Sequence, residues 1–508
     1  MHLPPKKVIY GLMGFLLLYA IFRSVAAAAG KPFWYDELIT LTVSSQGSSS
    51  GILNALRRPV DTQPPLFYVI EHFASHFSRN QEIAFRLPSI LAFPCTLICV
   101  FLSVRKHGNE IVALICAFLL LLTSTFQLYA VEARPYSMVV ACIAFALVCY
   151  RRAPSPLWTV LLALSLALGE SLHYFAVLTM IPFGLAEAVR LWTTKKFRWP
   201  VWTALVVGAM PVLVFWNLLA IDKAYFGAHI WNRFAFSFIP WAYGDFFQTN
   251  GEFGAGIAAV ALAGSMGAAL WHRSANASQS EEMREDPAEA TILAGMVALP
   301  FLAYLIVSVV HAGLSPRYIL STVLGIVLAL GYILSRAKPG VVALFAVFVF
   351  SAVGVHELHF WRSSRADIQN VKSSGIAAGK FIESAGHKEL PVVVPNGLAL
   401  LWLIHYASPP ATDRLLYPTP DHLPSDSNWA DTVDKGLEAA VDYLPLRISN
   451  FTEFGATHKE FLLYVVDEDT PRDWLTMRLS REGWSMETVA LDESRRIYLI
   501  TSRGNSSR

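Results

Sequence analysis

Long apolar segments recur through the first 360 residues and constrain the fold more than any other feature of the sequence. About 20 apolar residues are needed to cross ~30 Å of hydrocarbon. Eleven such segments lie near residues 8–28, 84–104, 109–128, 137–150, 156–173, 175–191, 200–220, 254–271, 291–311, 318–335 and 340–357, the fourth being rather short. Because 54% of the residues are hydrophobic and only 15% are charged, we predict a polytopic α-helical protein that lipid largely solvates.

Basic residues predict how these spans are oriented. They cluster in alternate connections, at Lys6–Lys7, Arg105–Lys106, Arg151–Arg152, Arg190–Arg198, Arg273 and Arg336–Lys338. The positive-inside rule then places the amino terminus in the cytoplasm, and an odd number of spans places the carboxyl terminus outside. The net charge of +2 does not favour nucleic acid as a partner. We expect a multi-pass membrane protein whose amino terminus is cytoplasmic and whose carboxyl terminus is extracytoplasmic.

The same frame divides the chain into two parts. Residues 1–358 form the membrane module, with a long first outer loop at 30–83, and residues 359–508 form an extracytoplasmic α/β domain. Within that domain we predict helices at 365–383, 397–407 and 471–481, and strands at 391–395, 460–466 and 496–501. A chain of about 140 residues is long enough to hold its own core.

The first outer loop is too apolar to be free in water. Pro64-Pro65 predicts the start of a helix on the membrane surface, with Leu66, Val69, Ile70, Phe73 and Phe77 on its apolar face, opposite Glu71, His72, Ser75 and Arg79. A second, shorter helix is expected to begin at Asp36, as its cap, and to run through Val43.

The cysteines and acidic residues argue against a bound cofactor. All five cysteines, Cys95, Cys99, Cys116, Cys142 and Cys149, lie in apolar spans, and no Cys/His spacing is typical of zinc. The adjacent carboxylates Asp36 and Glu37 have no clear third ligand, so we predict no cofactor and no tight metal site, and a weaker divalent-metal site stays open.

Six short strings carry polar residues at the predicted outer face. In chain order they are Asp36-Glu37, Gln63-Pro-Pro-Leu-Phe-Tyr68, Arg86-Leu-Pro-Ser89, Glu132-Ala-Arg134-Pro-Tyr136-Ser137, His173-Tyr174 and Pro316-Arg317-Tyr318. This ordered set resembles the GT-C superfamily of membrane glycosyltransferases, in the branch of protein O-mannosyltransferases, aminoarabinose transferases and related lipopolysaccharide-core transferases. The resemblance covers roughly residues 1–360.

The resemblance implies a protein of the bacterial cytoplasmic membrane that transfers a sugar, with inversion, from a polyprenyl phosphate to an acceptor at the outer surface of that membrane. No nucleotide sugar takes part at the site. The catalytic carboxylate of the family maps onto Asp36, with Glu37 beside it, and the arginine that approaches the lipid phosphate maps onto Arg317. One position departs from the pattern, since the mannosyl and aminoarabinosyl branches carry His or Lys where this chain has Gln63.

The chemistry of the residues supports the same roles. A carboxylate at the interface can accept the proton of an attacking hydroxyl, and a guanidinium can stabilise a leaving phosphate, for which Arg317 is the first choice and Arg134 the second. The remaining polar residues of the strings are expected to line the substrate cavity. They are Gln63, Tyr68, Arg86, Glu132, Tyr136, His173 and Tyr318.

Plainer roles exist for each of these residues. Asp36 and Arg86 can cap helices, Arg317 can anchor a span at the interface, and His173 can belong to an aromatic belt. Glu132 and Arg134 can form an ion pair.

Two other classes of function fit the composition. A polymerase or ligase of lipid-linked glycans would share the donor chemistry, and a lipid or solute transporter would share the many spans. Transporters tend to place charges at mid-bilayer and to show related halves, which this sequence does not. The predicted partners are therefore a polyprenyl-phosphate sugar and a glycolipid, glycan (lipopolysaccharide or polysaccharide) or protein acceptor.

Overall fold

The computed structural model describes residues 5–106, 109–227, 235–247, 287–367, 371–420, 431–466 and 474–502. The chain forms two compact units. The first, which we name the helical unit, contains Met1–Ala29, Gln63–Asn217 and Asn232–Ser364. The second, the α/β unit, contains Gly30–Thr62, Leu218–Trp231 and Arg365–Arg508. The segment that carries Asp36 therefore packs with the carboxyl-terminal part of the chain.

The helical unit is built from apolar helices. They are α1 (Lys6–Gly30), α4 (Pro65–Ala74), α5 (Gln81–Ala84), α6 (Leu87–Arg105), α7 (Glu110–Leu119), α8 (Ser124–Tyr129), α9 (Tyr136–Tyr150), α10 (Pro156–Leu172), α11 (Met180–Thr194), α12 (Trp199–Val214), α14 (Phe238–Phe247), α16 (Pro287–Val297), α17 (Leu299–Val310), α18 (Thr322–Leu334) and α19 (Pro339–Asp367). Short 3₁₀ helices lie at η1 (Leu120–Leu122), η2 (Tyr174–Thr179) and η4 (Pro316–Ile319). Helix α13 (Trp216–Phe226) continues from α12, and most of it belongs to the α/β unit.

Helices occupy the predicted spans that fall on described residues. Four, at Lys6–Gly30, Gln81–Arg105, Tyr174–Thr194 and Pro339–Ser363, are long and apolar enough to cross a membrane alone. Two further spans are bent pairs, α12 with α13 at 51° and α16 with α17 at 63°. The others are apolar helices of 10–17 residues, and the span expected at 254–271 lies outside the described residues. The total of eleven stays a prediction.

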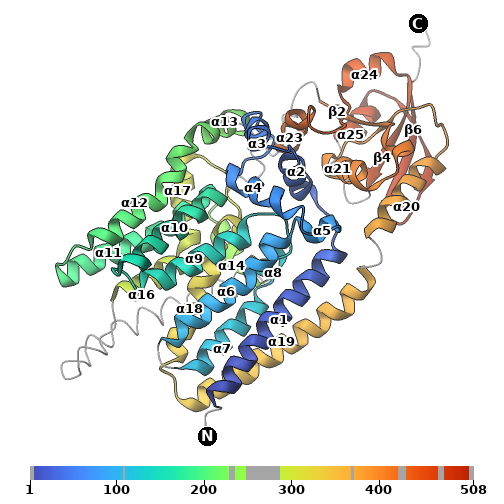
Figure 1. The fold of residues 1–508 in the computed structure, drawn as a ribbon. Coiled ribbons are helices and arrows are strands. Elements are labelled where there is room, and N and C mark those ends of the chain that lie inside the picture. Colours follow the sequence, from blue (N-terminus) through green and yellow to red (C-terminus); the bar gives the residue numbers. More distant parts are fainter. Residues whose placement is uncertain are drawn as a thin grey trace. The chain divides into compact units, whose positions relative to one another are not determined.

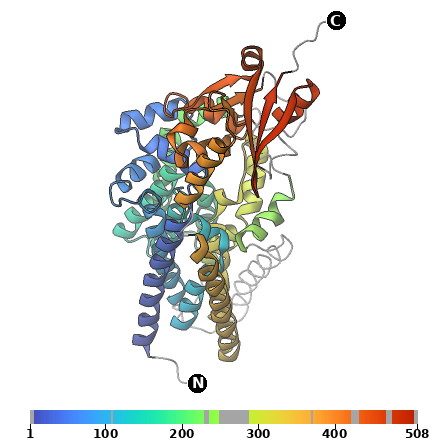
Figure 2. The same ribbon diagram turned by 90° about the vertical axis from the view of Figure 1, so that its right-hand side faces the viewer.

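Helices α1 and α19 lie side by side along one edge of the helical unit, as Figures 1 and 2 both show. A buried ion pair joins them, with the Arg23 Nε atom 2.6 Å from a Glu357 carboxylate oxygen. The Tyr19 hydroxyl donates to the same oxygen at 2.6 Å, and the Trp361 indole donates to Tyr19 at 2.9 Å. The first and last spans thus share one polar network within an apolar surface.

The two ends of the helical unit differ in chemistry. At one end the predicted cytoplasmic connections meet, because Arg105 donates to Tyr10, Arg151 to the Ser103 carbonyl and Arg198 to the Ala153 carbonyl. Helix α9 leads from this end to the other, and its 15 residues span about 22 Å. The predicted site residues Tyr136, His173 and Tyr318 lie at that other end. Which end faces the cytoplasm stays a prediction.

The helix predicted after Pro64-Pro65 forms as α4, and it ends at Ala74, so Phe77 and Arg79 lie beyond it. Glu71 is fully buried, whereas Phe73 and Phe77 are 64% and 75% exposed. The position of this helix on the membrane surface stays a prediction. In a chain solvated by lipid the exposed side is the apolar one, and polar side chains turn towards neighbouring helices.

The α/β unit is built on a six-stranded mixed sheet of order β3-β2-β1-β4-β6-β5. Its strands are β1 (Val392–Val393), β2 (Leu415–Thr419), β3 (Ile448–Asn450), β4 (Glu460–Val466), β5 (Ser485–Leu491) and β6 (Arg495–Thr501). The first four are mutually parallel where they pair, and β6 pairs antiparallel with both β4 and β5. Phe451, Phe461, Leu463, Leu475 and Ile500 belong to its core.

The α/β unit also contains helices (Figure 2). They are α2 (Tyr35–Ser44), α3 (Ser49–Arg57), α20 (Val371–Ser384), α21 (Gly397–Tyr406), α22 (Pro409–Thr412), α23 (Thr432–Ala440), α24 (Phe451–Thr457) and α25 (Trp474–Arg481). The strand predicted at 460–466 is present with the same ends, and the elements predicted at 365–383, 391–395, 397–407 and 496–501 are present with shifted ends. The helix predicted at 471–481 is present over its described residues, as α25. Strands β2, β3 and β5 were not predicted, because they are short or carry no continuous apolar run.

Candidate functional site

The acidic pair lies in the first turn of α2. Trp34, with extended backbone, is the cap of this helix, so the prediction that Asp36 is its cap is wrong. Glu37 is fully buried, and its carboxylate accepts a hydrogen bond from the Trp34 amide at 3.4 Å. Asp36 is half-buried. Acidic residues are favourable in the first turn of a helix, where the backbone amides carry partial positive charge.

Tyr35 fixes the start of α2 against the carboxyl-terminal part of the chain. Its hydroxyl lies 3.4 Å from the Val433 carbonyl oxygen, in α23. Burial raises the pKa of Tyr35 well above its ordinary value, and the carboxylates of Asp36, Asp61 and Asp434 raise it further. The hydroxyl therefore lies among three acidic groups, and the Asp36 carboxylate has negative neighbours in the α/β unit.

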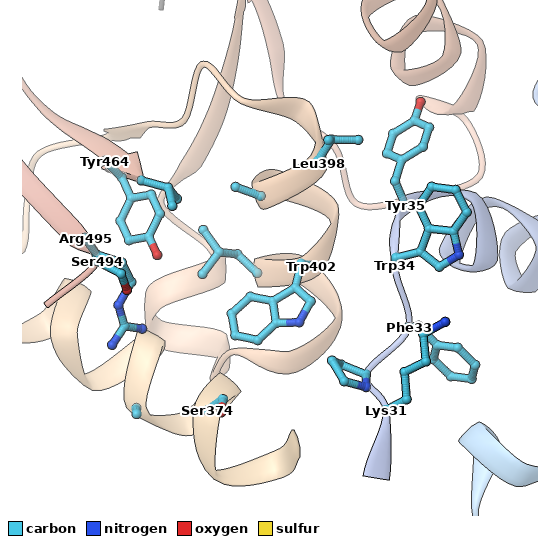
Figure 3. Close-up of a pocket in the computed structure, with 15 residues that line it drawn as sticks. Lys31, Phe33, Trp34, Tyr35, Ser374, Leu398, Trp402, Tyr464, Ser494 and Arg495 are labelled. Atoms are coloured by element: carbon cyan, nitrogen blue, oxygen red, sulfur yellow. The ribbon is translucent and has the colours of Figure 1, made fainter. Parts of the chain in front are cut away.

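A cavity of about 710 Å³ opens beside the residues that precede Asp36. Figure 3 shows Lys31, Phe33, Trp34 and Tyr35 along one wall, Tyr464, Ser494 and Arg495 along the opposite wall, and Trp402 and Leu398 of α21 between them. Most of its lining is apolar, with two indoles and two cations. Pockets of this size and composition are typical of ligand sites, in which a few polar groups orient an otherwise apolar or aromatic contact surface.

The end of the helical unit opposite the predicted cytoplasmic connections brings the rings of three predicted site residues together. The ring of His173 lies 5.2 Å from that of Tyr136 and 5.1 Å from that of Tyr318, and the two tyrosine rings are 6.2 Å apart. Phe175 and Tyr129 extend the cluster, at 4.8 Å from Tyr318 and Tyr136 respectively. The cluster thus joins α8, α9, the α10–η2 connection and η4.

Two guanidinium groups accompany these rings. The Arg317 guanidinium carbon lies 5.7 Å from the ring centres of both Tyr136 and Tyr318, a distance at which a cation is attracted to an aromatic face. Arg134 is 3% exposed, and its charge and that of Arg317 both act on the His173 ring. Ser89 donates to the Arg134 carbonyl at 2.9 Å, which fixes the backbone at that point.

Arg86 has a buried contact of its own. It is fully buried, and it donates from Nη1 to the Ala28 carbonyl at 2.8 Å, in the last turn of α1. This bond satisfies a carbonyl that the helix end leaves unpaired.

The remaining predicted residues, Gln63, Tyr68 and Glu132, are all buried in the helical unit. The Tyr68 ring packs edge-on against Phe67. The Gln63 side-chain oxygen has no hydrogen-bond partner among the described residues. A buried amide oxygen without a partner costs free energy, so Gln63 has a capacity for a hydrogen bond that the protein itself does not use.

The structure therefore divides the predicted site between the two units. Asp36 and Glu37 belong to the α/β unit, and the other nine residues belong to the helical unit. The sequence did not single out Tyr129, Phe175 or Trp402. Phe175 follows the predicted His173-Tyr174 string by one residue, which is a signal that could have found it, whereas Trp402 is one of several apolar residues in its helix.

Comparison with known proteins identifies the fold. No family model and no curated protein matches the sequence. The solved structures that match include ArnT from Cupriavidus metallidurans in the apo state, with a TM-score of 0.58 and 13% identity, and the same protein bound to undecaprenyl phosphate, with a TM-score of 0.55 and 12% identity. Each comparison covers 96% of this chain and 98% of ArnT. The fold predicted from the resemblance, a polytopic helical module followed by an α/β domain, is confirmed, and the chain has the fold of ArnT.

Proposed function

We propose that this protein is a membrane glycosyltransferase that transfers a sugar from a polyprenyl phosphate to an acceptor at the outer surface of the cytoplasmic membrane. The fold supports this proposal, since one of the similar structures is ArnT bound to undecaprenyl phosphate. The observation that carries it is the cluster of Arg317 with Tyr136, His173 and Tyr318, which combines a guanidinium group with aromatic walls.

The donor phosphate is assigned to Arg317 and Arg134. When the sugar leaves, the bond between its anomeric carbon and the phosphate oxygen breaks, and the electron pair remains on the phosphate. A guanidinium stays protonated at all working pH values and can donate two parallel hydrogen bonds to the developing charge. In a site from which water is largely excluded, such stabilisation contributes more than it would in water.

Asp36 is assigned as the general base. It accepts the proton of the acceptor hydroxyl as the hydroxyl oxygen attacks the anomeric carbon from the face opposite the phosphate, so the configuration inverts. A single displacement needs one carboxylate, in contrast to the double displacement of retaining glycosidases. Glu37 is assigned a positioning role, because its carboxylate holds the Trp34 amide and thereby the start of α2.

The acceptor is assigned to the cavity of the α/β unit shown in Figure 3. Its lining begins at Lys31 and ends, on the same segment, at Tyr35, one residue before Asp36. A hydroxyl group of a ligand in this cavity is therefore presented close to the proposed base within the same unit. The faces of Trp34 and Trp402 suit the C–H face of a sugar ring, and Lys31 and Arg495 suit a phosphate or carboxylate substituent.

The roles of Asp36 and Arg317 can be separated by measuring binding and transfer independently. Undecaprenyl phosphate added to purified protein should raise the unfolding temperature of the wild type and of Asp36→Asn, and should raise that of Arg317→Gln much less. Asp36→Asn should lower the transfer rate ~10²–10⁴-fold, the usual contribution of a general base. Asp413→Asn and Arg57→Gln, at exposed positions, are the controls. Wild-type turnover by Asp36→Asn, or wild-type lipid binding by Arg317→Gln, would overturn the assignment.

The glycolipid pool of a deletion strain separates this function from that of a polymerase or ligase. Mass spectrometry should show accumulation of a polyprenyl phosphate that carries one sugar. Accumulation of lipid-linked oligosaccharide would instead favour the polymerase or ligase.

A further inference from the structure

The connection between α11 and α12 forms a basic pocket that the proposed transfer reaction does not use. Helix α11 ends at Thr194, Lys195 follows in the left-handed conformation with φ 56°, and α12 begins at Trp199. Both helices belong to candidate membrane spans. A connection of four residues between two such spans must lie at the surface of the bilayer.

A cavity of about 630 Å³ lies in this connection. Three of its lining residues, Arg190, Lys196 and Arg198, are cationic, and Thr194 adds a hydroxyl. It contains no acidic lining residue. We name these four residues, with Lys195, the basic pocket.

A buried carboxylate holds two of the guanidinium groups in place without neutralising the pocket. Glu187 is 2% exposed, accepts a hydrogen bond from Arg198 Nε at 3.1 Å and lies 3.8 Å from Arg190 Nε. Tyr150 donates to the same carboxylate at 2.5 Å. Glu187 thus pre-orients two of the four cationic side chains of the basic pocket.

Exposed aromatic residues surround the basic pocket. Trp192 is 77% exposed, Trp199 71% and Phe197 43%, and the Lys195 ammonium lies 5.4 Å from the centre of the Trp192 ring. Phe197 stacks on Trp202 with a 6° angle between the ring planes. Exposed indoles beside lysines are typical of the level at which lipid headgroups meet the hydrocarbon. The anion that reaches this pocket most readily is therefore part of a lipid.

We propose that the basic pocket binds the phosphodiester headgroup of an anionic phospholipid. The Arg190 and Arg198 guanidinium groups, held by Glu187, and the Lys196 ammonium donate to the phosphate oxygens. Trp192 and Trp199 contact the upper part of the acyl chains. Basic pockets between membrane helices bind acidic lipid headgroups by this combination of charge and interfacial aromatics. The proposal is independent of the transfer chemistry, which it places at the other end of α9.

The experiment uses the full-length protein, stripped of lipid in a neutral detergent, and the double variant Lys195→Gln/Lys196→Gln. These lysines make no ion pair with Glu187, so their replacement leaves the buried network intact. Lys338→Gln, at an exposed lysine in the α18–α19 connection, is the matched control. Retention of cardiolipin or phosphatidylglycerol is measured by native mass spectrometry, and the unfolding temperature is measured with each lipid, with phosphatidylcholine and with inorganic phosphate.

The wild type and Lys338→Gln should retain anionic lipid and be stabilised by it, and phosphatidylcholine should have little effect. The double variant should bind anionic lipid at least ~5-fold more weakly for each lysine removed. Equal retention of anionic lipid by the double variant and the wild type would overturn the proposal. Stabilisation by inorganic phosphate to the same extent as by cardiolipin would also overturn it, because the pocket would then bind a free anion and not a lipid.

Discussion

The Tyr35 hydroxyl packs directly against Gly436. A Cβ atom added to Gly436 would lie only 2.6 Å from the hydroxyl oxygen. Gly436 is part of α23, and Tyr35 precedes the proposed base Asp36 by one residue. The close approach of these two residues, 401 positions apart in the sequence, requires a glycine in a helix where glycine is otherwise unfavourable. The carboxyl-terminal region therefore controls where α2 begins.

Replacing Gly436 by alanine should impair transfer without unfolding the protein. The added methyl group must displace the tyrosine, and a shift of about 1 Å at a reacting group can lower a rate ~10²-fold. The double variant Tyr35→Phe/Gly436→Ala, which removes the clashing oxygen, should regain most of the activity. The measurement is the transfer rate, with Gly184→Ala, at a helical glycine with open space around it, as the control. Equal loss of activity in the single and double variants would refute the steric argument.

Gln63 should show opposite effects on stability and activity. Its buried side-chain oxygen has no partner among the described residues, which costs ~1–3 kcal/mol. Gln63→Met, of similar volume, should raise the unfolding temperature, because it removes the unpaired oxygen. It should also lower kcat/KM, because we propose that a hydroxyl or amine of the sugar donor gives a hydrogen bond to this oxygen during turnover. Thermal unfolding without substrate and steady-state kinetics test the two halves separately. A variant that is neither more stable nor less active would show that Gln63 is only a packing residue.

Replacing only one residue of the Arg23–Glu357 ion pair should destabilise the protein more than replacing both. Removing one partner of a buried ion pair leaves an uncompensated charge and costs ~3–5 kcal/mol, whereas removing both can be nearly neutral. Glu357→Leu alone should therefore unfold at lower temperature or denaturant concentration than Arg23→Leu/Glu357→Leu. The exposed pair of Lys6 and Glu110, in which the lysine side chain is 79% exposed, provides the control, and its disruption should have little effect. Additive effects of the two leucine substitutions would contradict this account.

The raised pKa of the Asp434 carboxyl group should make the stability of the α/β unit depend on pH. Burial raises its pKa, with Glu438 and Asp431 adding to the shift and the hydrogen bond from Tyr417 opposing it. A carboxyl whose pKa is raised in the folded state stabilises fully below its unfolded pKa, and this contribution is lost as the pH rises through the folded value. The unit should therefore become less stable as the pH rises from the ordinary aspartate pKa to the raised one.

Asp434→Asn should flatten this dependence, because the amide oxygen still accepts the Tyr417 hydrogen bond but carries no charge. Unfolding temperatures measured across the acidic range, with Asp413→Asn as the exposed control, provide the test. A slope in Asp434→Asn as steep as that of the wild type would assign the pH dependence to other groups.

The sequence predicted the fold well where one physical rule dominates. Apolar length located the spans, and the strand at 460–466 was predicted at its observed bounds because it is a continuous buried apolar run. It was less accurate at helix ends, as in α4, which stops at Ala74 although the apolar spacing continues to Phe77. It also could not show that residues 30–62 pack with the carboxyl-terminal domain, because contacts such as that of Phe33 with Tyr406 involve residues hundreds of positions apart.

The site was predictable in its composition and less so in its organisation. The strings around Tyr136, His173 and Tyr318 were identified one by one, and the structure shows that their rings meet. The contact between Tyr35 and Gly436 left no signal, since a lone glycine in a polar helix has many explanations. The roles of Asp36 and Arg317 stay proposals.

The membership of α2 in the α/β unit has a consequence for biosynthesis. The ribosome completes the acidic segment within the first tenth of the chain, yet the residues that hold Tyr35, in α23, are made only after the last membrane span has been inserted. A nascent or truncated chain that stops before α23 thus contains the proposed base Asp36 but lacks the contact of Tyr35 with α23 that positions it. Newly made protein should consequently lack the proposed transfer activity until its final domain has folded.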